Sequence, residues 1–563
     1  MTTEDLFVAI PEGSEGYEDV PADVAYDGGE IDEDNEVPQS DPVWASEEGS
    51  HDQQMWNETD EPADEDEEEL SFLMRPPSEQ AEILAEIEDV ERTMPRLSED
   101  YRLVDRLGEG TFSSVYKAED IKYDEHLNSY WLGYHPRWSS AYYQTLPPQK
   151  TSRGKAYVAI KRIYVTSSPA RIENELLIME ELRGCRHVAQ LMTAFREEDQ
   201  ILAIMPFHRN QDFRSFYRVL PLPKIQSYFR CLFRALKDIH ARNVIHRDVK
   251  PANFLFDPAA EVGTLCDFGL AQRTSSPKLK CLHSSPTTTH PHGRFSWQDT
   301  SGQRSDKLAK AKQQYLNAPK RIAQGPEKVG YPTQDERPSV RANRAGTRGF
   351  RAPEVLLKCP DQTLSAIDVW SAGVILLSFL TGKFPVFNSN DDVEALMEIA
   401  AIYGAESMAK CAFLHNRTFL TNVPSADHSG TSLSELVRKL NPSLFITPDV
   451  DQTLLAGALD LLPRLLHLDC THRITSANAL EHSFLADPKI PERTVVPHVI
   501  GQGVCGHAHW QDDMDESHCV RVDGKIVRLR AGEGIPIGED PCEIHKDWWT
   551  DEGPGSDHGR YDM

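Results

Sequence analysis

The chain has 563 residues, with 89 Asp or Glu against 59 Lys or Arg and a formal net charge of −30. Residues 1–70 hold 26 acidic residues and no Lys or Arg, so the rest of the chain is close to neutral, at 59 − 63 = −4. No run of about 18 apolar residues occurs and no charged-then-apolar leader opens the chain, so neither membrane attachment nor secretion is expected. The ten cysteines are then expected to be mostly reduced thiols.

The first segment, residues 1–75, is expected to be a disordered acidic tail. It is poor in apolar residues and carries a run of six acids at 64–69, so burial cannot offset the entropy lost on ordering. A helix is expected within residues 76–100, packed on the domain that follows. One face of this helix is expected to carry the apolar residues that recur at helical spacing, Ile83, Leu84, Ile87 and Val90.

Residues 107–115 read Leu-Gly-Glu-Gly-Thr-Phe-Ser-Ser-Val, which predicts a strand, a tight turn and a second strand. Gly108 and Gly110 would let backbone amides approach the phosphates of ATP. Ser113 stands where a third glycine would complete the G-x-G-x-x-G pattern. Val115 would cover the adenine.

The sequence Val-Ala-Ile-Lys ends at Lys161, which would contact the α- and β-phosphates. A helix is expected from Ala170 to Arg183, with an acid that pairs with Lys161. Glu175 is the preferred acid, because Leu176 and Met179 then face inward. The alternatives are Glu173 and Glu180. A buried strand should follow at 201–205, so that Met205 lies at the back of the ATP pocket and Phe207 in the hinge.

Residues 246–253 read His-Arg-Asp-Val-Lys-Pro-Ala-Asn, the H-R-D-x-K-x-x-N pattern of a phosphotransferase loop. Asp248 would orient the substrate hydroxyl, and Lys250 would steady the phosphoryl group and indicates Ser or Thr as the target. Asn253 and Asp267, the latter in Asp-Phe-Gly, would bind magnesium. Asp368 should bond the backbone of this loop, and Phe268 should stack on His246.

The segment from Asp267 to Ala-Pro-Glu at 352–354 is unusually long. Its residues 274–345 contain 13 Lys or Arg against 5 Asp or Glu and are rich in Ser, Thr, Pro and Gln, which predicts a long flexible insertion. Two further insertions are expected at about 121–156 and 405–453. Thr347 should lie against Asp248 and Lys250 in a structural role, and Glu354 should pair with Arg473.

Zn²⁺ binding is one interpretation of two Cys/His sets, of which the first has metal-like pairs and the second has a spacing that fits no standard zinc finger. A polar loop is the alternative for the first set, and a tail packed on the domain through its tryptophans is the alternative for the second. The first set comprises Cys281, His283, His290 and His292. The second lies in the tail 489–563, which contains Cys505, His507, His518, Cys519, Cys542 and His545. Its candidate ligands are the pair Cys505 and His507 together with the pair His518 and Cys519.

The motifs occur in the order found in eukaryotic protein kinases, and the chain resembles that superfamily over about residues 101–488. The resemblance implies an α+β, bilobal fold with a small β-rich lobe and a large helical lobe. Within the superfamily the chain is similar to the cell-division-cycle seven kinases, the catalytic subunits of the Dbf4-dependent kinase (DDK). Arg348 departs from the proline that is usual in that family. The stretches that carry the similarity are 108–116, 205–207, 249–255, 267–272 and 345–354.

The resemblance implies a nuclear Ser/Thr kinase that uses ATP and Mg²⁺ and acts on the minichromosome maintenance helicase when replication origins fire. It also implies an activating regulatory subunit that grips the helix of Glu175, and no direct binding of nucleic acid is expected. The alternatives are another acidophilic or cyclin-dependent-like Ser/Thr kinase and a pseudokinase scaffold. Intact Lys161, Asp248, Asn253 and Asp267 argue against the scaffold.

Three arginines near Thr347 predict the substrate preference. Arg344, Arg348 and Arg351 would favour Asp, Glu or a phosphorylated residue after the target, because guanidinium groups pair with carboxylates and phosphates. Under the alternative interpretation, one of them, Arg351, only ties down the segment.

Overall fold

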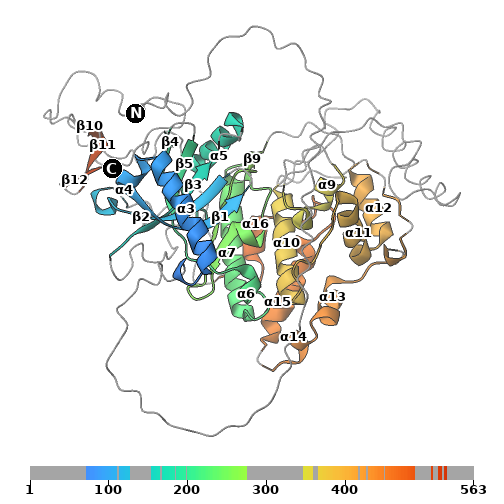
Figure 1. The fold of residues 1–563 in the computed structure, drawn as a ribbon. Coiled ribbons are helices and arrows are strands. Elements are labelled where there is room, and N and C mark those ends of the chain that lie inside the picture. Colours follow the sequence, from blue (N-terminus) through green and yellow to red (C-terminus); the bar gives the residue numbers. More distant parts are fainter. Residues whose placement is uncertain are drawn as a thin grey trace, which may run out of the picture.

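The computed structural model describes residues 72–274 and 346–487 except for short gaps, together with three strands within residues 509–528. The gaps are 111–112, 127, 129–153, 165–167, 184, 198–199, 359–364, 416, 418, 422, 427–428 and 449. A β-rich lobe and a helical lobe lie side by side (Figure 1). This arrangement confirms the expected α+β, bilobal fold.

One antiparallel sheet of five strands, in the order β1-β2-β3-β5-β4, forms the small lobe. Successive side chains of a strand point to opposite faces. In β5, Leu202 and Ile204 enter one buried apolar cluster and Ile201 and Ala203 enter another, so both faces of the sheet are covered. The strands are β1 (Tyr101–Gly110), β2 (Ser113–Asp120), β3 (Tyr157–Ile163), β4 (Thr193–Glu197) and β5 (Gln200–Pro206).

Helix α3 (Pro77–Thr93) covers one face of the sheet (Figure 1). Ile83, Ile87 and Val90 are buried in the cluster that contains Leu202, which confirms the expected helix and its packing. The expectation for Leu84 was wrong, because this side chain is 48 % exposed. It lies about 100° around the helix from Ile83, outside the stripe that touches the sheet.

The segment before α3 also corrects an expectation. Residues 72–75 were assigned to the disordered tail, yet Arg75 pairs with Asp105 of β1 at 3.1 Å and donates to the carbonyl oxygen of Arg106 at 3.0 Å. Residues 1–71, where the rest of the tail is expected, lie outside the described part of the chain.

Helix α5 (Pro169–Glu181) packs on the opposite face of the sheet from α3. Ile172, Leu176 and Met179 share a buried cluster with Ile201 and Ala203. The helix lies within two residues of its expected ends, and its packing places Leu176 and Met179 inside, as expected.

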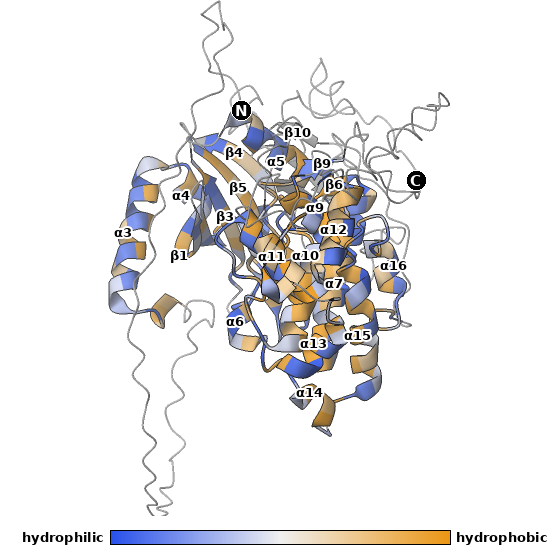
Figure 2. Cartoon of the chain, turned by 90° about the vertical axis from the view of Figure 1, so that its right-hand side faces the viewer, coloured by the Kyte–Doolittle hydropathy of each residue, from blue (hydrophilic) through white to orange (hydrophobic). Residues whose placement is uncertain are grey.

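The large lobe is organised around α10 (Ala366–Thr381), in which every residue is buried. Figure 2 shows α10 as a mainly hydrophobic helix among amphipathic neighbours. The neighbouring helices are α6 (Phe213–Phe216), α7 (Leu222–Ala241), α9 (Pro353–Leu356), α11 (Asp392–Tyr403), α15 (Gln452–Leu465) and α16 (Ser476–Glu481).

The stretch 405–453, expected to be an insertion, adds helices to the core of the large lobe. Met408, Leu433 and Val437 are buried there. Its elements are α12 (Ala405–Leu414), η5 (Pro424–Ala426), α13 (Leu433–Leu440) and α14 (Ser443–Ile446). The insertions expected within 121–156 and 274–345 fall largely outside the described residues.

The remaining elements are short. None of the helices in the described residues combines the length with the apolar surface that a membrane span requires. The short elements are α4 (Leu97–Asp100), η1 (Tyr123–Glu125), β6 (Val244–Ile245), η3 (Pro251–Asn253), β7 (Phe254–Asp257), β8 (Val262–Leu265), β9 (Gln272–Arg273), η4 (Arg348–Phe350), β10 (His509–Gln511), β11 (His518–Val522) and β12 (Lys525–Arg528).

Candidate active site

The loop that carries Asp248 is anchored by Asp368, a fully buried carboxylate on α10. Asp368 accepts the backbone N–H groups of His246 at 2.9 Å and Arg247 at 2.8 Å, as expected, and its Oδ2 also lies 2.9 Å from Nε2 of His240. Arg247 has a φ of +70°, a conformation that non-glycine residues rarely adopt. The anchor holds this turn and fixes the position of Asp248.

The carboxylate of Asp248 is surrounded by donors. Thr347 donates to its Oδ1 from the backbone N–H at 2.7 Å and from the hydroxyl at 2.8 Å, while Lys250 Nζ lies 2.9 Å from Oδ2 and 3.0 Å from Thr347 Oγ1. Burial would raise the pKa of Asp248, but Lys250 and Thr347 outweigh it and hold the pKa below its usual value. Asp248 is therefore ionised, and the expected contacts of Thr347 are confirmed.

Glycine is required where the chain returns to this loop. Gly346 has a φ of +98°, and a Cβ there would lie 2.4 Å from the backbone oxygen of Arg247. Only glycine brings Thr347 this close to Asp248 without strain.

A second ionic centre joins the two lobes. Lys161 Nζ on β3 lies 2.6 Å from Glu175 Oε1 on α5 and 3.0 Å from Asp267 Oδ1. Burial would lower the pKa of Lys161, but the two carboxylates raise it above its ordinary value. For Asp267, desolvation raises the pKa and Lys161 lowers it to about 2, so the lysine is charged and Asp267 is ionised.

The geometry distinguishes Glu175 from the two alternative partners of Lys161. Glu180 is buried beside Arg183, with 3.0 Å between Oε2 and Nη2, whereas Glu173 is exposed. The ion pair expected between Lys161 and Glu175 is the one that forms.

Two side chains of α5 that the motifs did not indicate fix the turn after Asp267. Arg171 Nε donates to the carbonyl oxygen of Gly269 at 3.0 Å, and Asn174 Nδ2 donates to that of Ala271 at 3.1 Å. A Cβ on Gly269 would meet Glu175 Oε2 at 3.2 Å, so glycine permits the close approach. The spacing of Arg171, Asn174 and Glu175 places them on one face of the helix, but it does not indicate which segment Arg171 and Asn174 contact.

The residues expected to bind magnesium have suitable chemistry. Asp267 is ionised and its side chain is 48 % exposed. Asn253 donates hydrogen bonds from its amide nitrogen to the backbone oxygen and to Oδ2 of Asp248, at 2.9 and 3.1 Å, so its amide oxygen is the atom that would contact a metal ion. Hard oxygen ligands of this kind suit Mg²⁺, so the residues fit the ion.

Zinc finds no support in the described part of the chain, where no cluster of three or more His, Cys, Asp and Glu side chains could hold a metal ion. Of the expected ligands, His518 and Cys519 lie in the described strand β11, of which the structure describes the backbone alone. The rest lie outside the described residues: Cys281, His283, His290, His292, Cys505, His507, Cys542 and His545.

The residues expected to hold the nucleotide lie on neighbouring strands. In the β1–β2 hairpin Gly108 is opposite Val115 and Gly110 is opposite Ser113, while Val115 is also opposite Lys161 on β3. Met205, near the end of β5, is opposite Ala159 of β3. Phe207 follows it and packs edge-on against Tyr157, with 6.5 Å between ring centroids.

The arginines near Thr347 differ in their surroundings. Arg351 is held by Asp392 at 2.8 Å and by the carbonyl oxygen of Gly346 at 2.8 Å, which matches the interpretation that it ties down the segment. Arg348 donates to the Ser389 carbonyl oxygen at 3.1 Å, and its side chain is 42 % exposed. Arg344 lies outside the described residues.

Two packing expectations are confirmed around the site. Arg473 forms a fully buried pair with Glu354, with 2.7 Å from Nη1 to Oε1. His246 packs edge-on against Phe268, with ring centroids 5.0 Å apart.

The comparisons with known proteins agree with this geometry. The model of the protein kinase domain matches residues 149–291 and 330–485, more than half of the chain. The chain is 43% identical over 413 residues to the cell cycle serine/threonine-protein kinase hsk1 of Schizosaccharomyces pombe, covering 71% of this chain and 75% of that protein. It is 35% identical over 394 residues to the probable cell division control protein 7 homolog 1 of Encephalitozoon cuniculi, covering 70% and 93%. This chain belongs to the cell division cycle 7 family of serine/threonine protein kinases.

A more distant member of the cell division cycle 7 family is the cell division cycle 7-related protein kinase of Homo sapiens, 29% identical over 450 residues, covering 62% of this chain and 73% of that protein. The comparisons confirm the serine/threonine kinase expected from the loop at 246–253. Membership of the protein kinase family implies that ATP and Mg²⁺ are used.

Proposed function

We propose that this kinase transfers the γ-phosphoryl group of ATP to serines and threonines that are followed by an acidic or phosphorylated residue. The partly exposed side chain of Arg348 carries the proposal, and its Nε makes only a long ion pair with Asp392, at 3.9 Å. It lies one residue from Thr347, which contacts Asp248, and its surroundings leave part of it open to solvent. An incoming carboxylate would find a cation at this point, whereas a proline would bring no charge to pair with it.

The proposed roles of the central residues follow from their contacts. Asp248, ionised and held by Thr347, orients the substrate hydroxyl and accepts its proton. Lys250, which bridges Asp248 and Thr347, lies where it stabilises the charge of the transferring group. Lys161, held by Glu175, contacts the α- and β-phosphates.

We further propose that Gly108, Gly110, Ser113, Val115, Met205 and Phe207 enclose the nucleotide. Asn253 and Asp267 would hold Mg²⁺, which neutralises phosphate charge when bound.

The proposed cellular role rests on the relatives. Those named above are called cell cycle or cell division kinases, and the proposed substrate is the minichromosome maintenance helicase at replication origins in S phase. The proposed partner is an activating subunit of the DDK type, and the proposed compartment is the nucleus. A pull-down of the full chain from S-phase nuclei tests the proposed substrate and the proposed partner. Recovery of the chain without any stoichiometric partner and without helicase subunits would contradict this role.

The substrate preference is tested with four peptides that differ only after the target serine, carrying Asp, phosphoserine, Pro or Lys. We expect kcat/KM to be about ten- to hundredfold higher for the Asp and phosphoserine peptides, since a charged contact contributes about 1.5–3 kcal/mol. Arg348→Ala should remove most of this difference. Arg464→Ala, an exposed arginine on α15, is the control and should preserve it. Equal rates for the Asp and Pro peptides would contradict the acidic preference, and a faster Pro peptide would favour a proline-directed kinase.

A further inference from the structure

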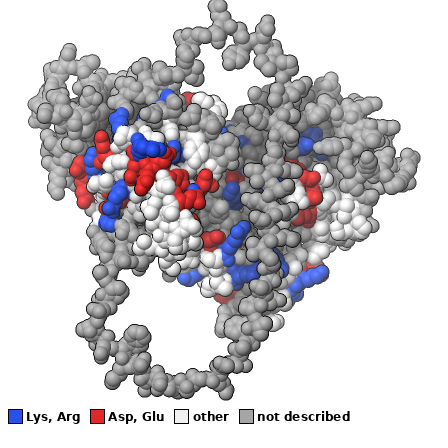
Figure 3. Space-filling view, viewed as in Figure 1, with Lys and Arg blue, Asp and Glu red and all other residues white. Residues whose placement is uncertain are grey.

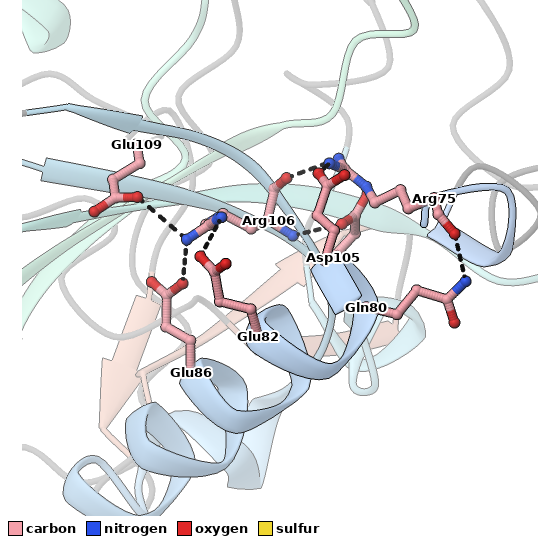
Figure 4. Close-up of polar contacts among 8 residues, drawn as sticks. Arg75, Gln80, Glu82, Glu86, Asp105, Arg106 and Glu109 are labelled. Carbon is pink, nitrogen blue, oxygen red and sulfur yellow. Dashed lines mark hydrogen bonds and ion pairs between the residues drawn. The ribbon is translucent and has the colours of Figure 1, made fainter. Parts of the chain in front are cut away.

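Arg106 on β1 is the centre of an ion cluster that reaches the glycine-rich hairpin. Its guanidinium contacts Glu82 at 3.0 Å and Glu86 at 2.8 Å, both on α3, and Glu109 at 3.2 Å (Figure 4). Only 17 % of the Arg106 side chain is exposed. Acidic and basic side chains gather on the face of the small lobe where α3 lies (Figure 3), and this cluster belongs to that face.

Glu109 connects the cluster to the part of the hairpin that is proposed to cover ATP, because it stands between Gly108 and Gly110. A Cβ on Gly108 would meet no atom within 4 Å, and one on Gly110 would meet only the Ser113 backbone oxygen, at 3.6 Å. Packing therefore does little to hold this stretch. The Glu109–Arg106 pair is therefore a side-chain tether that adds to the pairing of β1 with β2 along this stretch.

The other end of the tether is fixed. Helix α3 buries Ile83 and Ile87 against the sheet, and Glu86 also accepts a hydrogen bond from the hydroxyl of Tyr116 on β2. Arg75 holds the start of the helix to β1 through Asp105. The helix is thus attached to the two strands whose hairpin carries Glu109.

Three carboxylates share the single guanidinium of Arg106. Without this cation, Glu109 would be repelled by Glu82 and Glu86, and its freed carboxylate would lie in the hairpin that faces the anionic phosphates of ATP. Both effects disfavour the closed hairpin over a bound nucleotide.

We propose that Arg106 is a positioning residue for nucleotide binding, which holds Glu109 against α3 and keeps the glycine-rich hairpin set for ATP. The proposal rests on the proposed nucleotide-binding role of Gly108 and Gly110. Helix α3 then contributes to nucleotide binding, because Glu82 and Glu86 hold Arg106 in the position from which it contacts Glu109.

The test is a set of variants of the full chain, purified with any activating subunit that binds it and assayed at varied ATP. Arg106→Ala should raise the KM for ATP about two- to fivefold, the range that weak ion pairs give, and change kcat by less than about twofold. Arg102→Ala is the matched control, because Arg102 lies on the same strand and pairs with Glu119 of β2. It should leave the KM for ATP unchanged.

A double-mutant cycle separates positioning from general destabilisation. In a Glu109→Ala background, removing Arg106 should leave the KM for ATP unchanged, because the group that it holds is gone. The proposal would be overturned if Arg106→Ala raised the KM for ATP equally in the wild-type and the Glu109→Ala backgrounds. It would also be overturned if Arg106→Ala and Arg102→Ala gave the same KM for ATP. If Arg106→Ala fails to fold, Glu82→Gln/Glu86→Gln takes its place and should change the KM for ATP only when Glu109 is present. Wild-type enzyme that shows no ATP-dependent transfer would instead contradict the proposed function itself.

Discussion

Asp248 accepts hydrogen bonds or ion pairs on both carboxylate oxygens, and the site is arranged around its charge. Thr347 contacts Oδ1, while Lys250 and Asn253 contact Oδ2. These donors favour the ionised form. An asparagine would keep the shape of the side chain but would lack the charge that accepts a proton and pairs with Lys250.

We therefore expect Asp248→Asn and Lys161→Arg each to lower kcat by about three orders of magnitude or more, because phosphoryl transfer depends on positioning and charge stabilisation. The measurement is ATP-dependent phosphorylation of protein substrate by the purified enzyme, with circular dichroism to show that the fold persists. Asp460→Asn, an exposed carboxylate on α15, is the control. Turnover near the wild-type value in either variant would contradict the assigned roles.

Contiguous motifs made much of this site accessible from the sequence. Asp248, Lys250 and Asn253 lie within six residues, and the hydrogen bonds among them follow from that spacing. The ties from Arg171 and Asn174 to the turn at 269–271 could not be found in this way. They exist only because the fold brings α5 beside a segment almost 100 residues later in the chain, and no local pattern encodes that approach.

At the scale of elements, the periodicity of α3 predicted a helix but not which face it buries. Ile87 is three residues from Leu84 and four from Ile83, so the sequence allows either residue to share its face of the helix. The structure shows that the face packed on the sheet contains Ile83 and excludes Leu84. The strand β1 and the residues that precede α3 decide the orientation. Arg75 was missed because its partner, Asp105, lies 30 positions away.

The orientation of α3 predicts different costs for two neighbouring substitutions. Ile83→Ala should lower the free energy of unfolding by about 2–5 kcal/mol, because Ile83 is fully buried. Leu84→Ala, the next residue along the helix, should cost less than about 1 kcal/mol, since it faces solvent. Urea denaturation of the two variants measures the difference, and equal costs would show that the helix does not pack in this orientation.

Buried and exposed ion pairs of the large lobe should also differ. Glu354→Gln leaves Arg473 charged without its partner in the core, which should cost about 3–5 kcal/mol of unfolding free energy. The control Arg464→Ala breaks the solvent-exposed pair with Asp460 and should cost less than about 1 kcal/mol. Thermal and urea unfolding of both proteins provide the comparison. Similar costs would contradict the burial of the Glu354–Arg473 pair.

At the scale of the whole molecule, the position of α5 controls whether both lobes contribute to one site. Its Glu175 holds Lys161, and its Arg171 and Asn174 hold the turn after Asp267. Arg273 on β9 adds a pair with Glu181 at the end of the helix, at 2.9 Å. The ties from Arg171, Asn174 and Arg273 are polar and partly exposed, so each contributes about 1 kcal/mol. These three ties therefore stabilise the contact between α5 and the segment after Asp267 by a small margin, which a bound subunit can increase.

This margin predicts that the chain alone is much less active than its complex with a regulatory subunit, and that the tie from Arg171 matters most in the free chain. Arg171→Ala should lower kcat of the free chain about fivefold or more and that of the complex less than about twofold, because the subunit supplies the missing stabilisation. Glu173→Ala, an exposed residue of the same helix, is the control. Steady-state assays of each variant with and without the subunit decide the matter. An equal loss in free chain and complex would mean that Arg171 acts on the turn at 269–271 alone, and full activity of the wild-type chain without any subunit would remove the need for activation through α5.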